Sequence, residues 1–248
     1  MTSAMGDIVT IENAHKTFGR IVALDNLSLA IRDGECLAMV GRNGAGKTTT
    51  VRALCGRIAL DSGSIVWHAR RSASTPMCGL VPQEIALYPL LTGAENLAVF
   101  GALNGLRGAA LRERIEWALT WTALADRAHD PIKLWSVGMK RRLNIACGVL
   151  HGPGIALLDE PTAGVDPENR LRIWDMLHAL RDSGTSLLLT THQLHEAETV
   201  SDRIAIIDKG AVIACGTLDS LVGDTVGREH RPDLEAVFLH LTKAKVDE

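Results

Sequence analysis

Hydrophobic residues in this chain fall into two kinds of segment that alternate. Short runs rich in valine, isoleucine and leucine are separated by longer segments in which apolar residues recur at helical spacing. Continuous apolar runs of strand length are typical of a parallel sheet covered on both faces, so the pattern predicts an α/β fold. We expect core strands at residues 35–40, 154–158 and 186–190. Polar residues follow each of them, just past the C-terminal end of the strand, where open α/β sheets bind ligands.

Two regions depart from this alternation. Residues 8–11 and 27–31 have the composition of strands and are joined through a turn at Phe18 and Gly19, which predicts a small antiparallel β layer near the N-terminus. The middle of the chain has helical periodicity instead, which predicts an α-helical subdomain inserted into a mostly parallel α/β core. Its expected helices are residues 94–103, 111–123 and 139–150.

The length of 248 residues is enough for one sizeable core, so we expect a single domain over residues 1–248. The α/β core with its N-terminal β layer is expected at residues 1–83 and 154–216, and the helical subdomain at residues 84–153. Residues 217–248 are expected to form a short helical tail with a charged end.

Charge and cysteine content narrow the class of protein. Lys and Arg total 26 and Asp and Glu total 29, a formal net charge of −3, so we expect no nucleic-acid partner. Five scattered cysteines form no C-x-x-C pair, which argues against a zinc site and indicates a reducing cytoplasm. Residues 1–20 lack the apolar core of a secretory signal, and no apolar run approaches the roughly 18 residues of a membrane span.

A glycine-rich segment follows the first expected core strand. Residues 41–48 read Gly-Arg-Asn-Gly-Ala-Gly-Lys-Thr and fit the pattern G-x-x-x-x-G-K-[ST] of a P-loop, between an expected strand and an expected helix. Glycines let backbone N–H groups converge on phosphate oxygens, and the helix N-terminus adds the positive end of its dipole. We expect Lys47 to reach the β- and γ-phosphates of a nucleotide and Thr48 to bind Mg²⁺. The alternative is an ordinary glycine-rich turn.

Two carboxylates follow the second expected core strand. Asp159 ends an apolar run and is expected to hold Mg²⁺ through water. Glu160 is expected to accept a proton from, or to orient, the water that attacks the γ-phosphate. The alternative is a turn that ends the strand, because Pro161 follows directly and cannot continue a sheet ladder.

These residues and their order give the chain a resemblance, over nearly its whole length, to the nucleotide-binding subunits of ABC transporters. Phe18 resembles the aromatic residue that stacks on adenine, Gln83 resembles the Q-loop, residues 163–166 resemble the D-loop, and His192 resembles the switch histidine. Three segments resemble one branch of this family, the exporter ATPases related to daunorubicin-resistance and nodulation-type proteins. They are residues 87–96, 136–143 and 234–241.

The resemblance implies ATP and Mg²⁺ as ligands and a role for each matching residue. ATP binding is implied for Phe18, Gly41, Arg42, Asn43, Gly44, Ala45, Gly46, Lys47, Thr48 and Thr49. Mg²⁺ binding is implied for Thr48, Gln83 and Asp159, and catalysis for Glu160, His192 and Gln83. Contacts with ATP bound to a partner subunit in a dimer are implied for Ser136, Gly138 and Asp166.

The resemblance also implies partners and a place of action. The expected function is a subunit that binds and hydrolyses ATP to power a separate integral membrane permease of an exporter, with a drug, lipid or glycan as the substrate class. A second ATP-binding subunit is implied, as a homodimer or a heterodimer. The expected location is cytoplasmic, peripheral on the inner face of the cell membrane.

The signature of the family is altered in this chain. The family has Leu-Ser-Gly-Gly-Gln, whereas residues 135–139 read Trp-Ser-Val-Gly-Met. A backbone φ above zero at Val137 would cost about 1–3 kcal/mol, whereas a helical backbone there would tolerate valine. The alternative function is therefore an ATP-binding module of low turnover, acting as a switch or as half of a heterodimer.

Functions of other classes are less well supported. ABC ATPases that act on ribosomes or DNA usually carry two cassettes or a long coiled-coil insertion, and this chain has one cassette and no sustained heptads. No Asn-Lys-x-Asp guanine motif occurs, which argues against a GTPase.

Weaker patterns have plainer interpretations. Trp117 and Trp121 are one helical turn apart and are expected to pack an amphipathic face, the alternative being an aromatic ligand site. Residues 140–142, Lys-Arg-Arg, are expected to form a solvated face, the alternative being contact with acidic lipid or a partner. His192 and His195 have a spacing found in metal sites, but a switch histidine followed by a surface helix explains them better.

Overall fold

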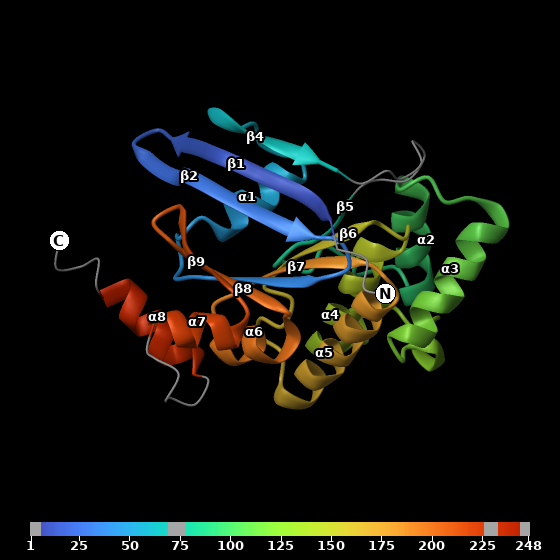
Figure 1. Cartoon of the computed structure of the whole chain (residues 1–248). Coiled ribbons are helices and arrows are strands. Elements are labelled where there is room, and N and C mark those ends of the chain that lie inside the picture. The colour runs from blue at the N-terminus through green and yellow to red at the C-terminus, as the bar shows by residue number, and fades with distance from the viewer. Residues whose placement is uncertain (1–5, 69–77, 226–232, 244–248) are drawn as a thin grey trace. The chain divides into compact units, whose positions relative to one another are not determined.

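The structure is a computed structural model that describes residues 6–68, 78–225 and 233–243. The chain divides into two compact units, residues 1–69 with 186–248 and residues 70–185. Their helices and strands are labelled in Figure 1, and each unit is described by itself below. The expected partition of the domain into core, helical subdomain and tail stays a prediction.

The first unit begins with an antiparallel sheet. Strands β1 (Asp7–Phe18) and β2 (Ile21–Arg32) form a hairpin, and β4 (Ser62–Trp67) pairs with the other edge of β1. The predicted antiparallel layer is confirmed, but its strands are longer than predicted. Asn13 and Asn26 have positive φ angles of 48° and 54°, and the pairing of β1 with β2 is irregular, so the alternation of apolar and polar residues is clear only over short stretches.

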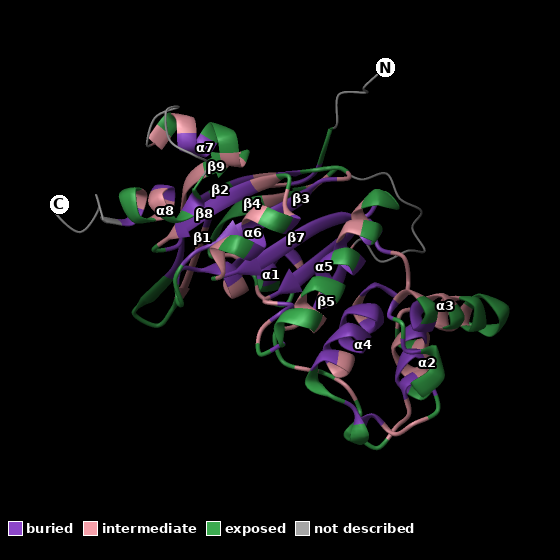
Figure 2. Ribbon diagram, turned by 90° about the horizontal axis from the view of Figure 1, so that it is seen from below, coloured by how far each residue is buried: buried purple, intermediate pink, exposed green. Residues whose placement is uncertain are grey.

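A second sheet of this unit is mostly parallel. Strand β3 (Cys36–Val40) lies between β7 (Ser186–Thr191) and β8 (Arg203–Asp208) and is parallel to both, whereas β9 (Ala211–Gly216) is antiparallel to β8. Every residue of β3 and β7 is buried (Figure 2). This burial explains why continuous apolar runs predicted these two strands correctly.

Helices complete the first unit. They are α1 (Lys47–Leu54), α6 (Leu194–Val200), α7 (Leu218–Thr225) and α8 (Leu234–Lys243). The last two pack against the sheet, because Leu221 and Leu234 lie in one buried cluster with Val40 and Ile204. The helices expected after the last strand are therefore present, while the charged end at residues 244–248 lies outside the described residues.

The second unit joins two parallel strands to helices. Strand β5 (Cys78–Val81) pairs with β6 (Ile155–Asp159). The helices are α2 (Gly93–Leu103), α3 (Gly108–Trp121), α4 (Val137–Val149) and α5 (Pro167–Asp182), with short 3₁₀ helices η1 (Ala125–Arg127) and η2 (Ile132–Leu134). The three helices expected in the middle of the chain are confirmed as α2, α3 and α4.

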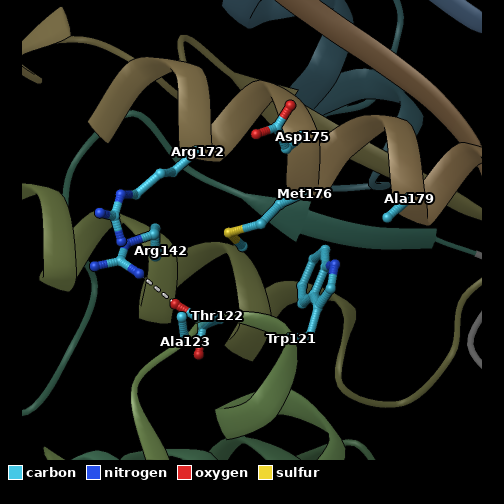
Figure 3. Close-up of a pocket in the computed structure, with 8 residues that line it drawn as sticks. All are labelled: Trp121, Thr122, Ala123, Arg142, Arg172, Asp175, Met176 and Ala179. Atoms are coloured by element: carbon cyan, nitrogen blue, oxygen red, sulfur yellow. Dashed lines mark hydrogen bonds between the residues drawn. The ribbon is translucent and has the colours of Figure 1, made fainter. Parts of the chain in front are cut away.

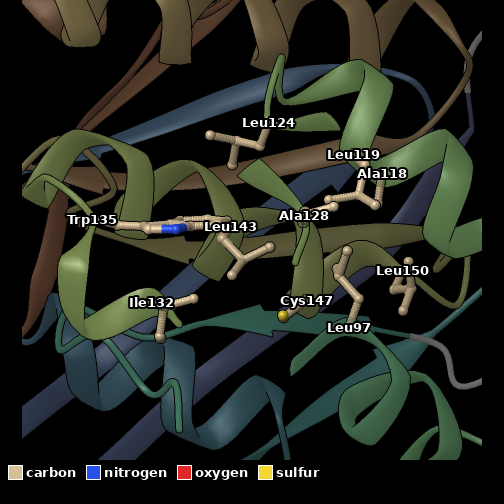
Figure 4. Packing of buried hydrophobic residues seen from close by; sticks show 11 residues of the cluster. Leu97, Ala118, Leu119, Leu124, Ala128, Ile132, Trp135, Leu143, Cys147 and Leu150 are labelled. Atoms are coloured by element: carbon tan, nitrogen blue, oxygen red, sulfur yellow. The ribbon is translucent and has the colours of Figure 1, made fainter. Parts of the chain in front are cut away.

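A shared hydrophobic cluster holds α2, α3 and α4 together. Leu97, Leu119, Leu143 and Leu150 are among its buried residues (Figure 4). Helix α2 begins with a capping box. The Thr92 hydroxyl accepts a hydrogen bond from the backbone N–H of Glu95, and the Glu95 carboxylate accepts one from the backbone N–H of Thr92.

Among the described residues, no helix is both long enough and apolar enough to cross a membrane.

Candidate functional site

The glycine-rich segment connects β3 to α1. Gly46 is the N-cap of α1 with a φ of 109°, and a Cβ there would lie 2.7 Å from the carbonyl oxygen of Ala23. A Cβ on Gly41 would lie 2.5 Å from the carbonyl oxygen of Ile207. Backbone therefore packs against backbone at both ends of the loop, which glycine permits and larger residues do not. Between these ends, Arg42, Asn43 and Gly44 are exposed and Ala45 is buried.

The side chain of Lys47 turns back into this loop. Its Nζ donates hydrogen bonds to the carbonyl oxygens of Gly41 (2.7 Å) and Arg42 (3.1 Å), and the residue is 6% exposed. The ammonium group therefore lies within the loop, at the helix N-terminus whose dipole also favours an anion. Thr48 and Thr49 follow in the first turn of α1, half-buried. This arrangement fits the phosphates of a nucleotide.

The parallel pairing of β3 with β7 brings His192 to the same end of the sheet as the glycine-rich loop. Val40 is the partner of Thr191, so Gly41 and His192 each follow a paired residue at one end of the two strands. His192 is exposed, and the backbone N–H of Gln193 donates to the Thr191 hydroxyl (3.0 Å) where the chain turns into α6. The structure therefore places the glycine-rich loop and His192 at the same end of two paired strands.

Phe18 is the last residue of β1 and is 49% exposed. The strand end beside it is fixed by Asp61, which accepts hydrogen bonds from Lys16 Nζ (2.6 Å) and from the backbone N–H (2.7 Å) and hydroxyl (2.8 Å) of Thr17. The bond from Lys16, followed by those from Thr17, lowers the pKa of the Asp61 carboxyl to about 2. The Lys16 ammonium also lies 5.6 Å from the centre of the Phe18 ring. An aromatic ring is thus presented on a well-anchored strand end.

In the second unit, the ladder of β5 and β6 aligns the predicted glutamine and carboxylates. Val81 is the partner of Leu158, so Gln83 and Glu160 lie just beyond the same ends of the two strands. Gln83 Nε2 donates a hydrogen bond to Glu160 Oε2 (3.0 Å), and Asp159 is buried as the last residue of β6. Glu160 has a φ of 47°, uncommon for a residue with a side chain, because the chain turns sharply after the strand.

Arg141 contacts two segments that carry predicted site residues, a position that the sequence did not predict. It is 5% exposed, and its guanidinium donates to the backbone carbonyl oxygens of Gln83 (2.6 Å) and Ala163 (3.1 Å). Burial lowers the pKa of this group. One side chain from α4 therefore joins the segment after β5 to the segment after β6.

The prediction of a solvated basic face at residues 140–142 is wrong for two of its three residues. Arg141 and Arg142 are both buried, whereas Lys140 is half-buried. A signal was present in the sequence: residues 143–149 are mostly apolar with no polar stripe, which is typical of a buried helix in which an arginine needs partners.

The altered signature forms the start of α4. Ser136 is the N-cap, and its hydroxyl accepts a hydrogen bond from the backbone N–H of Met139 (3.2 Å). Val137 is the first helical residue and is 52% exposed, so its backbone is helical and carries no positive φ. Of the two backbone conformations considered for Val137, the structure has the one that tolerates valine.

Gly138, near the start of α4, lies against the start of α5. A Cβ on Gly138 would lie 2.4 Å from Cγ of Asn169, so the two residues are in close contact. Asn169 in turn donates from its backbone N–H (3.0 Å) and from Nδ2 (2.8 Å) to the carboxylate of Asp166, the N-cap of α5. These two hydrogen bonds lower the pKa of Asp166. The structure thus brings Ser136, Gly138 and Asp166 into one connected group.

Trp135, the first residue of the altered signature, packs in the hydrophobic cluster shared by α2, α3 and α4. It is 4% exposed, belongs to the buried cluster in Figure 4, and leaves no room for a Cβ on Gly93, which would lie 2.5 Å from its ring. Trp117 and Trp121 pack against the same cluster with their rings stacked at 5.0 Å. The packing predicted for this tryptophan pair is therefore present.

An α/β fold that carries a glycine-rich phosphate loop between a strand and a helix defines a P-loop nucleotide-binding protein. The family model described as ABC transporter matches residues 24–163. The chain belongs to this ABC transporter family, which confirms the class of ATPase that the motifs predicted.

Similar proteins include ATP-binding proteins named for drug resistance and for Nod factor export. The linearmycin resistance ATP-binding protein LnrL of Bacillus subtilis is 38% identical over 224 residues, which cover 87% of this chain and 72% of the relative. The Nod factor export ATP-binding protein I of Ralstonia nicotianae is 39% identical, covering 89% and 70%. The doxorubicin resistance ATP-binding protein DrrA of Mycobacterium tuberculosis is 40% identical, covering 94% and 74%. The predicted resemblance to the exporter branch is confirmed.

Solved structures agree with the fold. An ATP-binding subunit of an ABC transporter superposes with a TM-score of 0.82 at 28% identity, covering 95% of this chain and 99% of that one. A dimeric ATP-binding cassette in a post-hydrolysis state with ADP and Pi superposes with a TM-score of 0.72 at 25% identity, covering 84% and 98%. The α/β fold class and the P-loop core are confirmed by these likenesses.

Proposed function

We propose that this chain is the subunit that binds and hydrolyses ATP to power a separate membrane permease of an exporter. The observation that carries the proposal is the P-loop, in which the Lys47 ammonium is held among backbone carbonyls at the N-terminus of α1. The relatives named for linearmycin resistance, doxorubicin resistance and Nod factor export support the exporter class.

In this proposal the first unit supplies the nucleotide contacts. The loop backbone and the N-terminus of α1 bind the phosphates, with Lys47 as the positive charge and Phe18 as the stacking surface for adenine. The residues proposed to contact ATP are Phe18, Gly41, Arg42, Asn43, Gly44, Ala45, Gly46, Lys47, Thr48 and Thr49.

Mg²⁺ is proposed to bind to oxygen atoms of Thr48, Gln83 and Asp159. A hydroxyl, an amide and a carboxylate are the donors that this small hard ion prefers, so the residues present fit it. When bound with ATP, the ion would neutralise charge that develops on the phosphate oxygens.

Glu160 is the proposed general base. Its carboxylate takes a proton from a water molecule as that water's oxygen bonds to the γ-phosphorus and the bond to ADP breaks. Gln83 donates a hydrogen bond to this carboxylate and so orients it. His192, exposed at the end of β7, is proposed to contact the γ-phosphate. The chemistry needs positioning more than strong acid or base catalysis.

We further propose that two ATP-binding subunits act together. Ser136, Gly138 and Asp166 are proposed to contact the ATP of the partner, and their connection through Asn169 would move them as one group. The solved dimeric cassette supports a dimer as the working form. The permease would place the subunit on the inner face of the cell membrane. The relatives differ in the compounds that their names give, which fits a permease that selects the drug, lipid or glycan.

The alternative of a low-turnover module is not favoured. Its support was Val137, and that residue is an exposed first residue of a helix, where valine causes no backbone strain.

Binding of ATP to the purified chain tests the proposal. Lys47→Ala is expected to weaken ATP binding at least about tenfold, because it removes the charge that the loop holds. Lys133→Ala, at an exposed lysine of η2, is the matched control and is expected to keep the wild-type affinity. Failure of the wild type to bind ATP, or equal affinity in Lys47→Ala, would contradict the proposal.

A further inference from the structure

The second unit contains an open cavity of about 250 Å³ that the proposed function does not use. It is lined by residues of α3 and the turn after it, of α4 and of α5. Figure 3 shows Arg142 and Arg172 on one side, Trp121 and Ala179 on the other, and Met176 between them. The cavity therefore combines two cations with an apolar wall.

The two guanidinium groups are the unusual feature. Arg142 is 6% exposed, its Nη1 donates to the carbonyl oxygen of Thr122, and its Nε has no hydrogen-bond partner among the described residues. Burial, and then the charge of Arg172, lowers the pKa of Arg142. A buried cation with an unpaired N–H beside a second cation is unfavourable unless an anion joins them. Arg172 has an exposed side chain and pairs with Glu168 (2.8 Å), one turn earlier on the same helix.

The apolar wall is supported by stacked rings and a hydrogen-bonded arginine. The Trp121 ring stacks on Trp117 at 5.0 Å with an interplanar angle of 15°, and the Arg114 guanidinium lies 3.9 Å from the Trp117 ring centre. Arg114 is fixed in turn by a hydrogen bond from Nε to the carbonyl oxygen of Leu150 (2.6 Å). Met176 is 5% exposed and adds a polarisable thioether to the same wall. A flat apolar group would meet a preformed surface here.

We propose that this cavity binds a small organic carboxylate with a flat apolar body, with the carboxylate between Arg142 and Arg172 and the apolar body against Trp121 and Met176. The cavity of about 250 Å³ has room for one ring and a carboxylate. Asp175 also lines the cavity, so a single negative charge fits better than a multiply charged phosphate.

Calorimetric titration of the full chain with phenylacetate tests the site. Saturable binding is expected, and phenylacetamide, which has the same shape without the charge, is expected to bind at least about tenfold more weakly. Inorganic phosphate, which lacks the apolar body, is expected to bind at least about tenfold more weakly than phenylacetate as well. Absence of saturable phenylacetate binding, or equal affinity for phenylacetamide or phosphate, would overturn the proposal.

Variants at three exposed positions are expected to change the affinity for phenylacetate in predictable directions. Arg172→Gln is expected to weaken phenylacetate binding about tenfold, Asp175→Asn to tighten it about threefold, and Ala179→Trp, which fills the cavity, to abolish it. Asp182→Asn, on the same helix but outside the cavity, is the control and should leave the affinity unchanged. Unchanged affinity in Arg172→Gln, or weaker binding in Asp175→Asn, would contradict the proposed position of the carboxylate between Arg142 and Arg172.

Discussion

Val137 is the residue at which the chain departs most clearly from the signature of its family. It follows the N-cap Ser136, begins α4 and is 52% exposed, so its side chain meets no crowded surface within its own chain. The N-cap hydroxyl bonds to the backbone N–H of Met139 across this position and keeps the first turn regular. At the scale of single residues, valine therefore replaces glycine without backbone strain.

Replacing Val137 with glycine is expected to leave the rate of ATP hydrolysis within about twofold of wild type, since no strain is relieved. The free energy of unfolding is expected to fall by about 0.5 kcal/mol, because glycine is a poorer helix former than valine. Steady-state hydrolysis and urea unfolding measure these effects. A tenfold faster Val137→Gly enzyme would mean that valine limits turnover.

Asp61 makes a pH-dependent contribution to stability at the strand end that carries Phe18. Hydrogen bonds from Lys16 and Thr17 lower its pKa from 3.8 to about 2, so this contribution is present above about pH 4 and is lost as the pH falls through about 2. Asp61→Asn is expected to have a lower Tm than wild type at pH 7, with a difference that shrinks between about pH 4 and 2. Thermal melts at several pH values measure it.

The control for that series is Asp7→Asn, at an exposed carboxylate at the start of the same strand. It is expected to show no comparable pH-dependent change in Tm. A difference between Asp61→Asn and wild type that stays constant down to pH 2 would contradict the assigned role of the ionised carboxylate.

Elements differ in how well the sequence predicts them. Strands β3 and β7 were predicted because all their residues are buried and apolar runs mark such strands. Strand β4 was not predicted, since its sequence Ser-Gly-Ser-Ile-Val-Trp is mainly exposed or half-buried and mixes polar with apolar residues. Local pattern therefore identifies elements of the buried sheet better than irregular edge elements.

The residues of the candidate site also differ in how well the sequence predicts them. The P-loop was predictable because phosphate binding demands glycines and a lysine at fixed positions close to each other in the sequence. The contacts of Arg141 were not, because they join residues 83, 141 and 163, and only the fold determines which carbonyl groups a buried arginine meets. Residues that bind through local geometry can be read from sequence, whereas residues that connect distant segments cannot.

Arg141→Met is expected to lower kcat at least about tenfold while KM for ATP changes less than about twofold. The substitution removes two hydrogen bonds that position the segments carrying Gln83 and Ala163, whereas the P-loop keeps its own contacts. The free energy of unfolding is expected to fall by about 1–3 kcal/mol. Lys140→Met, at the half-buried neighbour, is the control for hydrolysis. An unchanged kcat in Arg141→Met would show that this connection does not position the site.

At the scale of the whole molecule, the chain carries the parts of an ABC ATPase but, in the described residues, no helix that could cross a membrane. That a separate subunit provides the membrane path is our proposal, supported by the relatives named for drug resistance and Nod factor export. Family membership follows from a family model that matches more than half of the chain and from relatives near 40% identity.

The central claim is that this chain hydrolyses ATP with Glu160 as the base. Steady-state release of phosphate by the purified chain with ATP and Mg²⁺, compared with Glu160→Gln, tests it most directly. We expect clear turnover by the wild type and a rate at least about a hundredfold lower for Glu160→Gln, with ATP binding retained because the P-loop is intact. Equal rates for the two proteins, or no turnover by the wild type, would contradict the claim.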